Sequence, residues 1–179
     1  MNRRKALRSI SVATGAGLII PSFIGCNTSV YDPLFFTKDD LALVDEIGET
    51  ILPATVDTPG AKEAMVSNFL DKYINDCFTV EQQDIVWAGL DDFKTTCKVK
   101  YEKGFRRLSV EQRLAFLTEL DSQAKRSETL HYFSLLKSSI VLSFFTSQEG
   151  FEKALDYLPV PGKFIGNYPL KEGQKTWAL

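Results

Sequence analysis

The chain has 179 residues, of which 44% are hydrophobic and 12% aromatic, and its formal net charge is −2. These fractions are typical of a globular protein and argue against intrinsic disorder. The length suits a single domain with a real hydrophobic core.

The first 25 residues are typical of an export signal. Arg3, Arg4 and Lys5 precede an apolar stretch at residues 10–24 that is diluted by Gly, Ser and Thr. A paired arginine before a stretch of modest hydrophobicity resembles a twin-arginine translocation signal, whose pathway carries folded cargo. An ordinary secretory signal with a strongly basic start is the alternative.

The residues that follow predict a lipid anchor at Cys26. The run Phe23-Ile24-Gly25-Cys26 resembles a bacterial lipobox, in which the signal is cut before the cysteine and the thiol carries the lipid. Phe23 fits poorly to the competing cleavage, which needs small residues, and the apolar run is shorter than the roughly 20 residues of a spanning helix. We therefore expect a chain anchored on the periplasmic side of the cell envelope, and Asn27 favours the outer membrane.

Three parts are predicted: a signal at residues 1–25, a tether at 26–36 and a domain at 37–179. The signal contains four basic residues and no acidic one, so the remaining chain has a net charge of about −6. Because such a chain lacks clustered Lys and Arg, we do not expect it to bind nucleic acid. Its charge also gives no attraction to anionic lipid.

Helical spacing and capping signals predict an all-α domain, a compact bundle of five or six helices. Thr37 is expected to cap a first helix that Pro53 stops, and Thr58-Pro59 predicts the start of a second. The second helix would carry one apolar stripe, formed by Ala61, Met65, Phe69, Leu70 and Tyr73.

Two capping boxes, Thr79-x-x-Gln82 and Ser109-x-x-Gln112, predict helices at about residues 80–101 and 110–125, with residues 104–107 between them. The stretch from about 127 to 145 is apolar on most of its circumference. Such a helix is normally central, and we expect it at the centre of this domain.

The carboxy-terminal segment combines breakers with aromatic side chains. Its prolines and glycines argue against regular structure: Pro159, Pro161, Gly162, Gly166, Pro169 and Gly173. The segment is nevertheless too apolar for a free tail, so we expect it to lie packed on something.

Two cysteines fall within the predicted domain. Cys77 ends one predicted helix and Cys97 lies well inside the next, which separates them by more than the Cα distance of about 7 Å that a disulfide tolerates. We expect both thiols to pack as small apolar groups.

Candidate catalytic and metal-binding patterns are weak. Glu128-x-x-His131 has the spacing of a di-iron ligand pair, and Glu46-x-x-Glu49 could add oxygen ligands. Such a site needs two histidines, however, and the chain has one, so we expect a hydrogen-bonded histidine on a mostly buried helix. No nucleophile elbow and no motif for nucleotide, flavin, haem or zinc is present. We therefore predict no catalytic, cofactor-binding or metal-binding residue in this chain.

Three groups of residues carry a resemblance to a known family. They are Leu52-Pro53-Ala54-Thr55-x-x-Thr58-Pro59-Gly60-Ala61, then Phe144-Phe145-Thr146-Ser147-x-Glu149-Gly150, and then Ala154-Leu155-x-Tyr157 leading to Pro161-Gly162-x-Phe164-x-Gly166. In this order they resemble the gluconate 2-dehydrogenase subunit 3 family over about residues 40–170. The resemblance implies the small subunit of a membrane-associated sugar or sugar-acid dehydrogenase, whose large subunit holds FAD and often passes electrons to a cytochrome.

The implied role agrees with the predicted signal. Twin-arginine signals are common on cargo that folds around a cofactor, and a chain without a cofactor motif can instead escort a partner that has one. We therefore expect a non-catalytic accessory subunit that supports the maturation, export and membrane association of a FAD-dependent dehydrogenase. A lipid-anchored adaptor for another periplasmic assembly and an independent enzyme are the alternatives.

Tyr157, Phe164, Tyr168 and Trp177 are the predicted partner-binding residues. Rigid irregular backbone that exposes aromatic side chains suits a partner surface. The other motifs of the resemblance have a structural explanation first: residues 58–61 as a helix start, and residues 146–150 as a helix junction.

Overall fold

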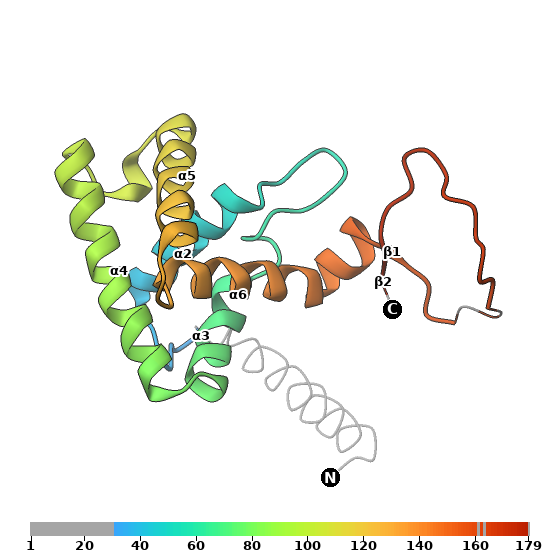
Figure 1. Cartoon of the computed structure of the whole chain (residues 1–179), viewed down its shortest axis with the longest axis horizontal. Coiled ribbons are helices and arrows are strands. Elements are labelled where there is room, and N and C mark those ends of the chain that lie inside the picture. Colours follow the sequence, from blue (N-terminus) through green and yellow to red (C-terminus); the bar gives the residue numbers. More distant parts are fainter. Residues whose placement is uncertain (1–30, 161, 163, 179) are drawn as a thin grey trace, which may run out of the picture. The chain divides into compact units, whose positions relative to one another are not determined.

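The computed structural model describes residues 31–160, 162 and 164–178 (Figure 1). Arg3, Arg4 and Cys26 lie outside the described residues, so the signal and the lipid anchor remain predictions. From Pro33 onward the chain forms one unit.

Helices dominate the described residues and confirm the predicted all-α class. The α-helices are α2 (Lys38–Ile51), α3 (Val66–Cys77), α4 (Val80–Tyr101), α5 (Val110–Arg126) and α6 (Tyr132–Thr146). A 3₁₀ turn, η1 (Phe105–Arg107), joins α4 to α5, and a π-helical turn, η2 (Gly150–Ala154), follows α6. Two short strands, β1 (Asp156–Tyr157) and β2 (Trp177–Ala178), pair in parallel.

Side-chain caps fix the starts of three helices. The side chains of Thr37, Thr79 and Ser109 each accept a hydrogen bond from the backbone amide three residues later. The side chain at that later position in turn accepts one from the backbone amide of the cap residue. These capping boxes satisfy amide groups that the first turn of a helix cannot pair internally. The predicted beginnings of α2, α4 and α5 are thereby confirmed.

Helix α6 lies at the centre of the bundle, as its apolar circumference predicts. It contacts α2, α3, α4 and α5 (Figure 1), and it buries Phe133, Leu136 and Ile140 almost completely. The ring of Tyr132 fills the space beside Gly89, where a Cβ atom would lie 2.0 Å from the ring. Glycine at this position of α4 therefore allows the two helices to approach closely.

Helix α3 begins later than predicted. The expectation that Thr58-Pro59 starts it was wrong, because the chain forms a loop and then a turn up to Met65. In that loop the amide of Ala61 donates to the carbonyl of Leu52 at 3.0 Å. The backbone is thus tied to the end of α2 instead of starting a new helix.

The apolar stripe predicted for this helix matches its buried face only in part, since Ala61 and Leu70 are buried but other members are not. Met65 and Phe69 are exposed, whereas Val66, Leu70 and Ile74 are buried. The later start is accompanied by a left-handed backbone at Met65, with φ 49°. The sequence alone does not show this turn, because it depends on the loop's contacts with α2.

Helix α6 also begins later than expected, at Tyr132. His131 is its N-cap, and its Nδ1 accepts a hydrogen bond from the amide of Phe133 at 3.1 Å. The expectation of a hydrogen-bonded histidine is right, but its place within the helix was wrong. Glu128 lies in the preceding loop, so Glu128 and His131 do not have the helical spacing of a ligand pair.

Neither Cys77 nor Cys97 is in a disulfide. Cys97 is fully buried in the core, and burial raises the pKa of its thiol. Cys77 is the last residue of α3 and is exposed. The expectation that both thiols are packed was therefore wrong for Cys77.

Candidate functional site

Of the four predicted partner-binding aromatics, Tyr157 and Trp177 lie on two short paired strands, and Phe164 and Tyr168 lie in the loop that these strands close. Asp156 pairs with Trp177 and Tyr157 with Ala178, so the chain leaves and returns at one point (Figure 1). These strands correct the expectation that the segment has no regular structure. They form because the amide of Asp156 donates to the carbonyl of Thr176 at 2.9 Å.

All four aromatic side chains are exposed to some degree. Tyr157, Phe164, Tyr168 and Trp177 retain 41%, 96%, 39% and 45% of their accessible surface. The expectation that this segment is packed was therefore wrong for Phe164. A side chain of this size that is left in water gives the fold little stability and is available to a partner.

Ring contacts hold three of these four residues in place. Tyr168 and Trp177 pack edge to face with centroids 5.0 Å apart, and Tyr157 lies 4.8 Å from Phe151 of η2. Tyr157 and Phe151 also border a shallow hollow of about 360 Å³. The structure therefore brings Tyr168 and Trp177 together and places Tyr157 beside a concave surface.

The junction before this loop depends on Gly150. The hydroxyl of Ser147 accepts from the amide of Gly150 at 3.0 Å, and a Cβ atom on Gly150 would lie 1.9 Å from the carbonyl oxygen of Phe144. The prediction of a helix junction at residues 146–150 is confirmed. Its geometry determines the direction in which the chain enters the aromatic loop.

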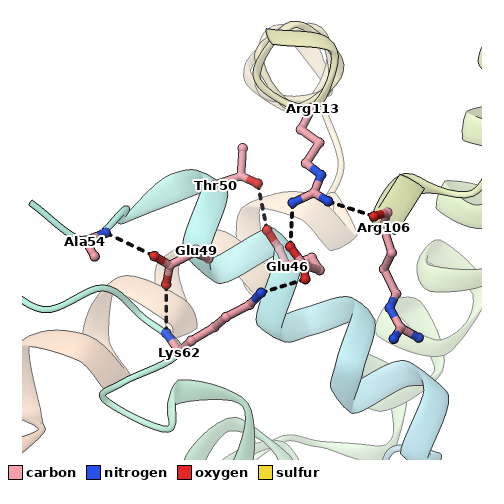
Figure 2. A network of polar contacts seen from close by, with 7 residues as sticks. All are labelled: Glu46, Glu49, Thr50, Ala54, Lys62, Arg106 and Arg113. Atoms are coloured by element: carbon pink, nitrogen blue, oxygen red, sulfur yellow. Dashed lines mark hydrogen bonds and ion pairs between the residues drawn. The ribbon is translucent and has the colours of Figure 1, made fainter. Parts of the chain in front are cut away.

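A second cluster of polar groups centres on Glu46 of α2 (Figure 2). Its carboxylate accepts from Lys62 at 2.6 Å and from Arg113 of α5 at 2.5 Å. Burial favours the neutral acid, but the hydrogen bond from Lys62 and the charge of Arg113 outweigh it and hold the pKa of Glu46 below its usual value. Two cations therefore occupy the carboxylate that we considered as a metal ligand.

Glu49, one turn further along α2, holds the following loop. It accepts from the amides of Ala54 and Lys62, both at 3.0 Å (Figure 2). A Cβ atom on Gly60 would lie 2.3 Å from the Glu49 carboxylate, so glycine permits this close approach. The motif at residues 52–61 thus forms a loop fixed to α2, and Glu49 is occupied by backbone amides.

A third polar group joins the start of the domain to α3. Asp71 is fully buried, and its carboxylate accepts from the amides of Leu34, Phe35 and Phe36 at 2.7, 2.9 and 2.7 Å. Hydrogen bonds to an ionised acceptor are stronger than neutral ones. The last three residues of the predicted tether are therefore held at a defined place on the domain.

Within the described residues, no group of three or more His, Cys, Asp or Glu side chains could hold a metal ion. No helix of that same part of the chain is both long and apolar enough to cross a membrane.

The comparisons with known proteins give one match. The family described as gluconate 2-dehydrogenase subunit 3 matches residues 38–162. The chain belongs to the gluconate 2-dehydrogenase subunit 3 family. Comparison with curated proteins and with solved structures gives no match.

The family match covers only one of the four aromatic residues of the candidate partner surface. The gluconate 2-dehydrogenase subunit 3 match contains all five described α-helices, η2 and Tyr157, but it ends before Phe164, Tyr168 and Trp177. Membership of this family associates the chain with a dehydrogenase complex. The three aromatics beyond residue 162 lie outside the matched region.

Sequence reasoning missed the roles of Asp71 and Arg113. The partners of Asp71 lie 35 to 37 residues away, and Glu46 lies 67 residues from Arg113. No local spacing connects such pairs. A charged residue on the apolar face of a predicted helix was the available signal for Asp71, which lies between the buried Leu70 and Ile74.

Proposed function

We propose that this chain is a non-catalytic accessory subunit of a FAD-dependent sugar or sugar-acid dehydrogenase. The observation that carries this proposal is the family match over residues 38–162. The exposed aromatics of the carboxy-terminal loop support it, because aromatic anchors supply much of the energy of protein interfaces. In this proposal FAD and the oxidation belong to the large subunit, and a cytochrome subunit can accept the electrons.

The second part of the proposal concerns export. Arg3 and Arg4 would direct the folded complex to the twin-arginine translocase, and Cys26 would carry the lipid that retains it at the membrane. Several acyl chains, at about 0.8 kcal/mol per buried methylene, anchor a protein firmly without a spanning helix. A large subunit without a signal of its own would then reach the periplasm only together with this chain.

Coexpression with a candidate large flavoprotein that lacks a signal tests the proposal. With the wild-type chain, the flavoprotein should appear in the membrane-attached periplasmic fraction and oxidise sugar with an artificial acceptor. Replacing Arg3 and Arg4 with lysine should leave both proteins in the cytoplasm. Cys26→Ser should export both without membrane attachment.

Four results would contradict parts of this proposal. Export of the flavoprotein without this chain removes the escort role, and export of the double lysine variant removes the twin-arginine signal. Sugar oxidation by the purified chain alone would make it an enzyme. Recovery of the chain in an assembly without a flavoprotein would favour the lipid-anchored adaptor.

A further inference from the structure

A groove of about 670 Å³ lies between α2, α4 and η1. Leu43, Phe93 and Phe105 close its base, and all three are at most 6% exposed. Because these residues belong to the packed core, the base of the groove is rigid. Its volume lies within the range of about 300–1,000 Å³ that is usual for small-molecule binding pockets, so it has room for at least one inserted side chain.

The rim of the groove carries more positive than negative charge. Its cations are Lys94, Lys98, Arg106 and Arg107, and its carboxylates are Asp39 and Glu46, so the cations exceed the carboxylates by two. This local excess contrasts with the chain as a whole, whose net charge is −2.

Three of the four cations are available to a ligand. Lys94 pairs with Asp40 at 2.5 Å. Among the residues that the structure describes, the side chains of Lys98, Arg106 and Arg107 have no hydrogen bond or ion pair. The carboxylate of Glu46 does not neutralise them, because Lys62 and Arg113 already occupy it.

The Glu46 cluster holds the arginine side of the groove in position. Arg113 donates to the carbonyl oxygen of Arg106 at 2.7 Å, and its guanidinium lies 5.7 Å from the ring centroid of Phe105. Figure 2 shows the side chain of Arg106 extending away from this cluster. The backbone of η1 is therefore fixed while the guanidinium of Arg106 remains unpaired, an arrangement that reduces the entropic cost of binding.

We propose that this groove binds an acidic segment of a partner protein, with carboxylates at Lys98 and Arg106 and an apolar side chain against the base. Arginine pairs well with carboxylates because its planar fork can donate two hydrogen bonds, and the lysine stem offers apolar surface beside its charge. Because the apolar base lies within a groove and is almost completely buried, an inserted side chain of a peptide segment suits this site better than a flat anionic bilayer. This site lies within the family match and does not depend on which subunit supplies the segment.

Gly104 provides a way to close the groove without disturbing the fold. It lines the groove, its φ of −72° suits any residue, and a Cβ atom there would meet no atom within 4 Å. Gly104→Glu therefore places a carboxylate in the groove, and Gly104→Ala is its control. Arg106→Glu reverses a groove charge, and Lys125→Glu makes the same change at an exposed residue of α5 outside the groove.

The test measures binding of two fluorescent peptides to the full-length chain by anisotropy. One peptide has glutamates on both sides of a central phenylalanine and leucine, and the other has glutamine at each glutamate. We expect the acidic peptide to bind, with salt weakening it, and to lose about tenfold in affinity with Gly104→Glu and with Arg106→Glu. Gly104→Ala and Lys125→Glu should leave its affinity unchanged.

The proposal is overturned if the glutamine peptide binds equally well, or if Lys125→Glu weakens binding as much as Arg106→Glu. It is also overturned if phosphatidylglycerol vesicles bind through these residues while the acidic peptide does not. Circular dichroism of each variant checks the helices, and Gly104→Glu keeps the test decisive if Arg106→Glu does not fold.

Discussion

The helical domain and the carboxy-terminal loop fix their backbones in different ways. In the domain, capping boxes begin three helices, and buried or half-buried carboxylates connect segments far apart in the sequence. The loop at residues 158–176 is closed by one pair of short strands and supported by a few ring contacts. The domain therefore derives its order from many long-range contacts, whereas the loop leaves the aromatic ring of Phe164 almost fully exposed.

This difference indicates which part of the chain is free to meet a partner. A residue that supports the core cannot change its contacts without a cost in stability. Phe164, which is 96% exposed, does not support the core. Substitutions in the domain should therefore change the free energy of unfolding, and substitutions in the loop should change binding alone.

The largest expected effect is at Asp71. Asp71→Ala removes three charge-assisted hydrogen bonds to backbone amides and leaves those donors unpaired, one of them fully inside the protein. We expect the free energy of unfolding to fall by about 4 kcal/mol. Denaturant unfolding of the full chain, followed by circular dichroism, measures it.

Asp76→Ala is the matched control for Asp71. Asp76 lies on the same helix and is exposed, so its loss should change stability by less than about 0.5 kcal/mol. If the two variants lose similar stability, the hydrogen bonds from the amides of residues 34–36 to Asp71 contribute little to the stability of the fold. Figure 1 shows the start of the described chain beside α3, in agreement with these hydrogen bonds to Asp71.

A smaller effect is expected at Glu46. Glu46→Gln removes the charge that Lys62 and Arg113 share, and because these groups are only partly buried we expect a loss of about 2 kcal/mol. Glu119→Gln, which breaks an exposed pair with Lys100, should cost less than about 1 kcal/mol. Equal losses would show that the partly buried position of Glu46 does not strengthen its ion pairs.

The contribution of Glu46 should also depend on pH. Its pKa is lower in the folded chain than the ordinary value of 4.5, so the folded state binds its proton less readily than the unfolded state. The contribution is then complete above about pH 4.5 and is lost as the pH falls through the lower folded value. The stability difference between wild type and Glu46→Gln should shrink in that range, and a constant difference from pH 7 to pH 3 would contradict this.

Local sequence signals predicted the parts of this fold that depend on neighbouring residues. Capping boxes gave the starts of α4 and α5, and the apolar circumference of α6 gave its central place. The predicted start of α3 and the predicted place of His131 within a helix were wrong, because tertiary contacts decide both. Of the candidate site, the sequence indicated the exposed aromatic loop, but the Glu46 and Asp71 clusters join residues too distant for any spacing to reveal.

The smallest expected effect on stability is at Phe164. Phe164→Ala removes a ring that is 96% exposed, so the unfolding free energy should stay within about 0.5 kcal/mol of the wild type. If this ring anchors the large subunit, truncation should cost about 2 kcal/mol of binding, or about a 30-fold loss of affinity. Titration of the purified large subunit with the wild-type and variant chains measures the change.

Val99→Ala is the control for Phe164, because Val99 is an exposed apolar residue on α4. It should leave both stability and binding unchanged. Deletion of residues 163–179 extends the test: it removes β2 and three of the aromatics but none of the five α-helices, so helicity should remain while partner capture is lost. Retained capture would remove the loop from the interface, whereas lost helicity would show that the domain depends on the loop for its fold.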